Sequence, residues 1–564
     1  MGTLDWVVIG IFFLALIGII VWVVKPKQND SADYFLGGRD ATWLAIGASI
    51  FASNIGSEHL IGLAGAGASS GMAMAHWEIQ GWMILILGWV FVPFYSRSMV
   101  YTMPEFLERR YNPQSRTILS VISLISYVLT KVAVTVYAGG LVFQQVFGIK
   151  ELWGIDFFWI AAIGLVVLTA LYTIFGGMKS VLYTSVLQTP ILLLGSLIIL
   201  VLGFKELGGW DEMMSICSAV TVNEYGDTMT QLIRDNNDPN FPWLGALVGS
   251  AIIGFWYWCT DQFIVQRVLS GKNEKEARRG TIFGAYLKLL PVFLFLIPGM
   301  IAFALHQKYI GAGGEGFLPL LANGTANADA AFPTLVAKLL PAGVKGLVVC
   351  GILAALMSSL ASLFNSSAML FTIDFYKRFK PETPEKKLVG IGQIATVVIV
   401  ILGILWIPIM RSVGDVLYTY LQDVQSVLAP GIAAAFLLGI CWKRTSAKGG
   451  MWGLIAGMII GLTRLGAKVY YSNTAITDSS MFKYLFYDLN WLFFCGWMFL
   501  FCIIVVIAVS LMTEAPSAEK IQGLVFGTST PEQKAATRAS WNHWDIIHTV
   551  IILAITAAFY WYFW

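Results

Sequence analysis

Residues 51–70 place polar side chains in a stretch that is otherwise apolar enough to cross a membrane. The stretch reads FASNIGSEHLIGLAGAGASS and contains Asn54, Glu58, His59 and four glycines. Every backbone N–H and C=O inside a bilayer must be paired, so an interrupted helix is tolerated only where the freed groups line a cavity or bind a ligand. The residues therefore predict a ligand site at membrane depth. The alternative is a helix kinked for packing, with Asn54 and His59 bonded to neighbouring helices.

A second interrupted helix is predicted about 200 residues later. Residues 254–262 read GFWYWCTDQ, in which aromatic residues give way to Asp261 and Gln262 within a hydrophobic span. Two broken helices at this separation fit the first helices of two five-helix halves, an arrangement typical of inverted-repeat membrane proteins. The alternative for Trp256, Tyr257 and Trp258 is aromatic packing.

Glu78 and Lys288 are isolated charges in predicted spans, and each would be costly against lipid. Each is expected to face an aqueous cavity or a partner. A carboxylate accepts hydrogen bonds from hydroxyl groups and an ammonium donates them, so the two would suit a polyhydroxylated ligand. A structural pair, Glu78 with Lys288 or Asp261 with Lys288, is the alternative.

Ala355, Ser358 and Ser359 are spaced i, i+3 and i+4, which places one carbonyl and two hydroxyls on one face of a helix. Hard cations take such oxygen ligands. Serine on a membrane helix also commonly serves helix packing. The cation hypothesis is strengthened if the unwound backbone near Ala52 and Ile55 faces these serines.

The elements that must position these residues are membrane helices. The 564-residue chain is 57% hydrophobic and 12% charged, with a mean hydropathy of +0.73, which predicts an all-α polytopic membrane protein. The first apolar run, residues 6–24, follows Asp5 without a basic segment or a cleavage site, and is expected to remain as an anchor. About fourteen spans are predicted, centred near Leu16, Ile55, Ile86, Leu124, Ile163, Leu193, Gly254, Leu294, Leu356, Val400, Pro430, Leu454, Met498 and Leu553.

Basic residues are concentrated in alternate loops, which predicts that both termini lie outside, extracellular or periplasmic, in a plasma or inner membrane. An even number of spans agrees with this placement. The chain has no phosphate-binding loop, no H-E-x-x-H, no GxSxG and no dinucleotide fingerprint, so an enzyme is not predicted. Neither a nucleic-acid partner nor an obligate protein partner is indicated, and the expected surroundings are the lipid bilayer.

At these same residues the sequence resembles the solute:sodium symporter family, most closely its sodium/glucose (galactose) cotransporter branch. The motifs FASNIGSEHLIGLAGAGA, WYWCTDQFIVQR, GAYLKLLP, LMSSLASLFNSSAMLFTIDFY and AAAFLLGICWKR lie in order across nearly the whole chain. The resemblance implies a LeuT-like five-plus-five inverted repeat with accessory helices. It divides the single transporter domain, residues 1–564, into an extra helix (5–25), a first repeat (42–206), a second repeat (243–442) and accessory helices (449–564).

The resemblance also implies the site residues. The family's sugar contacts fall on Asn54, His59, Glu78, Tyr257, Trp258, Lys288 and Gln422. Its sodium site falls on the backbone of Ala52, Ile55 and Ala355 and on the hydroxyls of Ser358 and Ser359. The implied activity is sodium-coupled import of a hexose such as glucose or galactose by alternating access, with Tyr257 as an inner gate. The alternatives are a sodium/myo-inositol symporter and a sugar-gated sodium conductance or sensor.

Some positions depart from the resemblance. Gly254 and Gln425 stand where animal glucose carriers have threonines, and Glu58 replaces a small residue beside the histidine. In two-sodium members a second ion site uses an aspartate in a Tyr-Thr-Asp context, whereas this chain reads Tyr183-Thr184-Ser185. Because a neutral hydroxyl is a poor substitute for that charge in a low-dielectric site, one Na⁺ per sugar is predicted.

Overall fold

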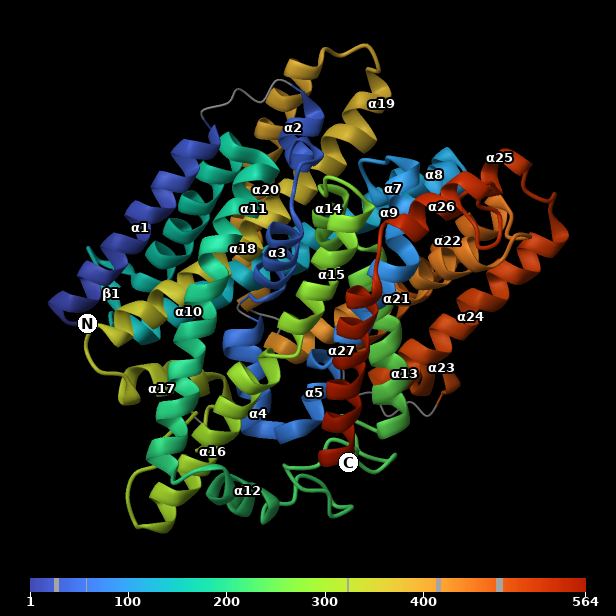
Figure 1. The fold of residues 1–564 in the computed structure, drawn as a ribbon. Coiled ribbons are helices and arrows are strands. Elements are labelled where there is room, and N and C mark those ends of the chain that lie inside the picture. The colour runs from blue at the N-terminus through green and yellow to red at the C-terminus, as the bar shows by residue number, and fades with distance from the viewer. Residues whose placement is uncertain (25–29, 57, 322–323, 412–416, 473–479) are drawn as a thin grey trace.

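The computed structural model describes residues 1–24, 30–56, 58–321, 324–411, 417–472 and 480–564. Within these ranges, the backbone alone is described for residues 129, 130, 145, 409–411, 417–423 and 472. Apart from one two-stranded hairpin, the elements in this part of the chain are helices (Figure 1). Helices satisfy their backbone hydrogen bonds internally, which is the condition for apolar segments to enter a bilayer.

The chain up to residue 218 forms α1 to α12 and the hairpin, whose bounds are α1 Thr3–Val24, α2 Ser31–Leu36, α3 Trp43–Asn54, α4 Ala64–Ser70, α5 Ala75–Glu78, α6 Gly81–Ile86, α7 Val92–Ser98, α8 Met103–Arg110, α9 Pro113–Ser126, α10 Ala133–Phe147, β1 Glu151–Leu152, β2 Ile155–Asp156, α11 Phe157–Leu207 and α12 Trp210–Ser218. Short 3-10 or π-helical turns join several of them, namely η1 Gly37–Arg39, η2 Glu58–Leu63, η3 Gly71–Met74, η4 Leu87–Phe91 and η5 Tyr127–Val132.

The later helices are α13 Trp243–Gly254, α14 Gln262–Leu269, α15 Glu274–Lys288, α16 Ile297–Gly311, α17 Ala331–Leu339, α18 Val344–Met369, α19 Lys377–Phe379, α20 Glu385–Arg411, α21 Leu417–Cys441, α22 Ala447–Ser472, α23 Met481–Lys483, α24 Trp491–Met512, α25 Ala518–Ile521, α26 Pro531–Ala539 and α27 His543–Tyr562. The turns among them are η6 Phe255–Thr260, η7 Val292–Leu296, η8 Ala328–Ala330, η9 Leu370–Tyr376 and η10 Tyr484–Asp488.

Eleven helical segments among the described residues are long and apolar enough to cross a membrane. One of them, α11, contains two of the predicted span centres, Ile163 and Leu193. The helix changes direction at Gly177, where φ is +52° and a Cβ would collide with the backbone of Tyr34. The all-α polytopic architecture is therefore confirmed, while the count of fourteen spans remains a prediction.

Burial separates central helices from peripheral ones. In α18 the most apolar window is 89% buried, and the helix packs against α11, α1, α3 and α20. The corresponding windows of α1 and α27 are only 22% buried. Central helices can hold polar side chains in protein-lined surroundings, whereas peripheral helices present apolar side chains outward. The functional residues are accordingly expected around α18 and its neighbours.

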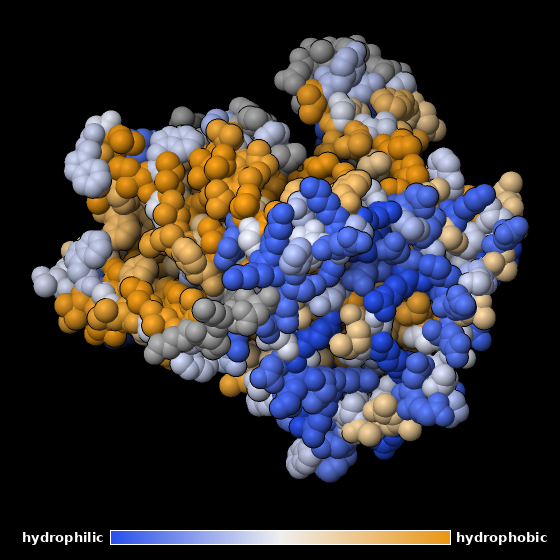
Figure 2. Space-filling view, turned by 90° about the horizontal axis from the view of Figure 1, so that it is seen from above, coloured by the Kyte–Doolittle hydropathy of each residue, from blue (hydrophilic) through white to orange (hydrophobic). Residues whose placement is uncertain are grey.

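The chain termini contact two long loops, residues 208–242 and 306–345. The charge pattern assigns both loops to the same side of the membrane. Near the N-terminus, the Asp5 carboxylate accepts hydrogen bonds from the backbone N–H groups of Gly343 (2.6 Å) and Gly346 (2.8 Å). Near the C-terminus, the carbonyl of Phe563 accepts from the N–H of Leu232 at 2.9 Å. Seen from above, the surface is largely hydrophilic on its right side and hydrophobic on its left (Figure 2).

Candidate substrate and ion site

The first broken helix is present where the sequence predicts it. Helix α3 ends at Asn54, Ile55 is extended (φ −79°, ψ 103°), and η2 begins at Glu58. The N–H groups of His59 and Leu60 both donate to the carbonyl of Gly56, at 3.1 and 3.3 Å. Among the described residues, no backbone N–H donates to the carbonyl of Ile55 across this break. The first break therefore leaves backbone oxygen available inside the protein.

The second broken helix lies between η6 and α14. Asp261 is extended there (φ −76°, ψ 128°), and its carboxylate caps α14 by accepting from the N–H of Phe263 at 3.2 Å. The second Asp261 oxygen receives a hydrogen bond from the ammonium of Lys131 at 2.6 Å, and the Tyr127 hydroxyl also donates to the carboxylate. The groups at the second break are therefore hydrogen-bonded within the protein, and few are left to bind a ligand.

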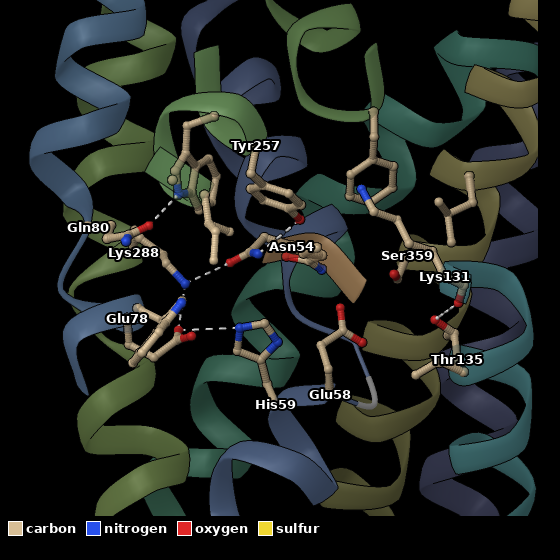
Figure 3. Close-up of a pocket in the computed structure, with 18 residues that line it drawn as sticks. Asn54, Glu58, His59, Glu78, Gln80, Lys131, Thr135, Tyr257, Lys288 and Ser359 are labelled. Atoms are coloured by element: carbon tan, nitrogen blue, oxygen red, sulfur yellow. Dashed lines mark hydrogen bonds and ion pairs between the residues drawn. The ribbon is translucent and has the colours of Figure 1, made fainter. Parts of the chain in front are cut away.

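One pocket lies between the two broken helices and α18 (Figure 3). Of the sugar contacts implied by the resemblance, the pocket brings together Asn54, His59, Glu78, Tyr257, Trp258 and Lys288. The side chain of Gln422 lies outside the described residues. The pocket is also lined by residues that were not assigned to the site, including Glu58, Gln80, Lys131, Thr135, Ser359 and Gln425.

A charged network forms one wall of the pocket. The ammonium of Lys288 donates to Glu78 Oε2 at 2.5 Å and to Asn54 Oδ1 at 3.1 Å. His59 Nε2 lies 3.3 Å from the same Glu78 oxygen, although its alignment is not that of a hydrogen bond. These four side chains are all at least 94% buried. A carboxylate and an ammonium can stay charged at this depth because each offsets the other.

The partner of Lys288 is therefore Glu78, and the alternative pairing with Asp261 is wrong. Asp261 is bonded to Lys131 at 2.6 Å, and Lys131 lies on the side of the pocket opposite Glu78 and Lys288 (Figure 3). Lys131 was not among the site residues expected from the sequence. The available signal in the sequence was a lone lysine in an apolar stretch. In the structure, Lys131 Nζ lies 4.8 Å from the centre of the Tyr257 ring, which brings it to the pocket.

Aromatic side chains form a second wall. The Tyr257 hydroxyl accepts from Asn54 Nδ2 at 3.1 Å, and Trp258 Nε1 donates to Gln80 Oε1 at 3.3 Å. Gln80 Nε2 in turn donates to the carbonyl of Ser250 at 2.9 Å. A Cβ on Gly254 would lie only 2.6 Å from Gln80 Oε1. The absence of a side chain at position 254 therefore makes room for Gln80, whose role the sequence alone did not indicate.

The residues of the implied sodium site lie between α3 and α18. Ala52, Ile55, Ala355, Ser358 and Ser359 are each at least 98% buried. The hydroxyls of Ser53 and Ser362 are 2.6 Å apart and join the end of α3 to α18. Ser358 Oγ lies 3.3 Å from Ser185 Oγ, and Ser359 borders the pocket. The end of the first broken helix therefore contacts the serine-bearing helix through Ser53 and Ser362, while the facing of Ala52 and Ile55 toward Ser358 and Ser359 remains a prediction.

Comparison with known proteins agrees with this architecture. A model of the sodium:solute symporter family matches residues 34–457. Sodium/myo-inositol cotransporter 2 of Homo sapiens is 37% identical over 538 residues, covering 93% of this chain and 79% of that protein. Sodium/glucose cotransporter 1 of Ovis aries is 37% identical over 529 residues, covering 90% of this chain and 79% of that protein.

The solved structure of a Na⁺-coupled sialic acid symporter is similar in fold, with a TM-score of 0.72, 22% sequence identity, and coverage of 92% of this chain and 99% of that one. The fold class implied by the sequence is thus confirmed as a LeuT-like transporter fold. The match to the family extends over both broken helices, the pocket between them and α18. This chain belongs to the sodium:solute symporter family and is a multi-pass membrane protein that couples solute transport to sodium.

Proposed function

We propose that the protein imports a ring polyol together with Na⁺, and that the polyol is a hexose such as glucose or galactose. The observation that carries the proposal is the joining of a buried Glu78–Lys288 pair, the Asn54 amide and two aromatic side chains in one pocket. Hydroxyl groups both donate and accept, so they match a wall that carries a carboxylate, an ammonium and an amide.

The polar wall would bind substrate hydroxyls while remaining paired. An ammonium has three donors, of which Lys288 directs one to Glu78 and one to Asn54. A substrate hydroxyl can receive the third. The aromatic wall would contact the C–H face of the ring, and Trp258 is held in place for this by its bond to Gln80.

The second candidate substrate is myo-inositol, which is favoured by the relatives named sodium/myo-inositol cotransporters. Both substrates display a six-membered ring of hydroxyls, so the charged wall serves either. Gly254 and Gln425, together with Glu58, are lining positions at which the sequence departs from animal glucose carriers, and Gln80 packs over Gly254. Selectivity between the two substrates is proposed to depend on this side of the pocket.

Sodium is proposed to bind between Ala52 and Ile55 on the first broken helix and Ala355, Ser358 and Ser359 on α18. Bound there, the ion would hold the two elements together and stabilise the outward-open state with its substrate pocket formed. Substrate binding would then allow closure, and Tyr257 would move off the ring as the inner gate opens. One Na⁺ supplies about 2.3 kcal/mol per 100 mV and about 1.4 kcal/mol per tenfold gradient, which supports roughly 500-fold accumulation.

The same proposal includes the repeat organisation and orientation given by the sequence. Residues 42–206 and 243–442 would form the inverted repeats, and each begins with one of the two broken helices. Both termini would lie outside a plasma or inner membrane. This placement is supported by the contacts of Asp5 and Phe563 with the two loops that carry few basic residues.

The test is uptake of labelled glucose, galactose and myo-inositol into proteoliposomes under an inward sodium gradient, with a potassium gradient as the reference. Concentrative uptake of one of these ring polyols is expected. Gln422→Ala should weaken substrate affinity about tenfold and leave sodium binding largely intact, since each lost bond to a buried hydroxyl costs about 1–3 kcal/mol. Glu78→Gln should weaken substrate affinity as well, and because it also leaves the ammonium of Lys288 without its countercharge, thermal unfolding of this variant is measured alongside. Sodium currents without accumulation would instead indicate a sugar-gated conductance or sensor.

A further inference from the structure

Glu58 stands in the first helix break and is not used by the substrate or ion contacts described above. Its side chain folds back over Gly56, so that a Cβ on that glycine would collide with a carboxylate oxygen and lie 2.9 Å from Glu58 Cδ. The carboxylate is directed into the pocket, on the side where Asn54 and Ser359 lie (Figure 3). It therefore lies against the backbone that directly follows Ile55.

The Glu58 side chain is half-buried, and one of its carboxylate oxygens is unpartnered. Its Oε2 atom is buried and has no hydrogen-bond partner. The two ammonium groups that line the pocket are already bound to other carboxylates, Lys288 to Glu78 at 2.5 Å and Lys131 to Asp261 at 2.6 Å. The charges balance within each of these two pairs, although Asp261 itself does not line the pocket, so neither lining ammonium is left to pair with Glu58.

A carboxylate oxygen that is buried without a hydrogen-bond partner is costly, so this position favours a ligand that carries positive charge. Oxygens that hard cations prefer occur in this region, namely the Glu58 carboxylate and the Ser359 hydroxyl in the pocket lining and the carbonyl of Ile55 in the helix break. The implied ion site contains only neutral oxygens, and Ser185 contributes no charge where two-sodium relatives are expected to carry an aspartate.

We propose that Glu58 is the charged ligand of a sodium ion bound between the first helix break and α18. This inference rests on the proposed function in taking Na⁺ as the coupling ion. Because Glu58 precedes His59 and borders the same pocket as Asn54, the ion and the substrate share one cavity wall. Filling the ion position neutralises Glu58, and the substrate then enters a pocket whose charges are balanced.

The experiment measures Na⁺ binding to the purified full-length protein in the absence of substrate, by titration calorimetry or by displacement of ²²Na⁺, with choline keeping the ionic strength constant. Glu58→Gln preserves size and removes the charge, and it should weaken Na⁺ binding at least tenfold. Substrate affinity measured at saturating sodium should change less than threefold. The matched control is Glu382→Gln, the same change at an exposed glutamate, which should leave both affinities unchanged.

A second variant separates charge from folding. Glu58→Asp keeps the charge on a shorter side chain, so its sodium affinity should lie between those of the wild type and Glu58→Gln. Unchanged Na⁺ affinity in Glu58→Gln would overturn the proposal. So would a variant that loses substrate affinity alone, which would make Glu58 a substrate contact, and so would wild-type uptake driven by a pH gradient without sodium, which would make it a proton site. A wild-type protein that binds no Na⁺ would instead refute the proposed function itself.

Discussion

The two helix breaks differ in how their freed groups are satisfied. At the second break, between η6 and α14, the side chain of Asp261 caps the following helix and is itself bonded by Lys131 and Tyr127. At the first break, between α3 and η2, the Ile55 carbonyl receives no backbone hydrogen bond from the described residues, and Glu58 Oε2 lacks a partner. A helix break whose polar groups are all hydrogen-bonded by nearby side chains stabilises the fold. A break that leaves polar groups without hydrogen bonds is suited to bind a ligand.

Both breaks contain an acidic residue, but only Glu58 lines the pocket. Asp261 is 96% buried and compensated, so its removal is expected to affect folding. Glu58 has an unpartnered carboxylate oxygen, so its removal is expected to affect ligand binding. Substitutions at and around the two breaks test whether folding and ligand binding are separated in this way.

Asp261→Asn should destabilise the protein strongly, because the substitution leaves the ammonium of Lys131 buried without a countercharge. Breaking a buried pair by removing one partner typically costs about 3–5 kcal/mol. Thermal unfolding of the detergent-solubilised protein measures the loss, and the double variant Asp261→Asn with Lys131→Met should recover part of it. The exposed Asp211→Asn is the control. Wild-type stability in Asp261→Asn would show that the second break is not held by this pair.

Ser359→Ala should raise the sodium concentration for half-maximal transport about tenfold, equivalent to ~1.4 kcal/mol, since one oxygen ligand of the proposed ion site is removed. Transport measured against sodium concentration checks this. Ser367 lies on the same helix and has a buried hydroxyl without a hydrogen-bond partner, which makes Ser367→Ala the matched control. A drop in protein yield with unaltered sodium dependence would assign Ser359 to helix packing.

One Na⁺ should enter with each substrate molecule. Ser185 donates to the carbonyl of Val181 at 2.6 Å and lies 3.3 Å from Ser358 Oγ, so its hydroxyl is engaged within the protein and brings no formal charge. Simultaneous measurement of charge and labelled substrate entering voltage-clamped membranes gives the ratio. Two charges per substrate would mean that other oxygens, Glu58 among them, support a second ion beside the first break.

The smallest effect concerns Asp329, which packs over the segment that follows the first break. A Cβ on Gly65 of α4 would lie 2.5 Å from Asp329 Oδ1, and burial raises the pKa of this carboxyl from 3.8 to about 6. Because the folded protein binds this proton more tightly than the unfolded chain, the contribution of Asp329 to stability should decline as pH rises from about 4 to 6.

The measurement is the difference in melting temperature between wild type and Asp329→Asn across pH 4–8. The variant should gain relative stability of a few degrees above pH 6 and lose this advantage near pH 4. Ionisation of Asp329 would then weaken its packing against Gly65 of α4. A difference that is constant with pH would show that the carboxyl is not perturbed by its packing.

Much of this molecule was determined by sequence alone, because polar residues at membrane depth are costly and therefore stand out. The interruption at residues 51–70, the aromatic and acidic run at 254–262 and the serine face of α18 were each recognised from residue types and spacing. The structure confirms both breaks and the contact between the first break and α18. Local sequence could do this because helix interruption and helical periodicity depend on neighbouring residues.

Only the tertiary structure decided which side chains pair across the pocket. Lys288 is 210 residues from Glu78 in the chain, and Lys131 is 130 residues from Asp261. Nothing in the spacing distinguishes these pairs from Asp261 with Lys288, since attraction depends on distance in space and not along the chain. The same applies to Gln80, which reaches Trp258 because Gly254 leaves room for it, and to Glu58, whose lack of a partner is visible only after every other pocket charge has been assigned.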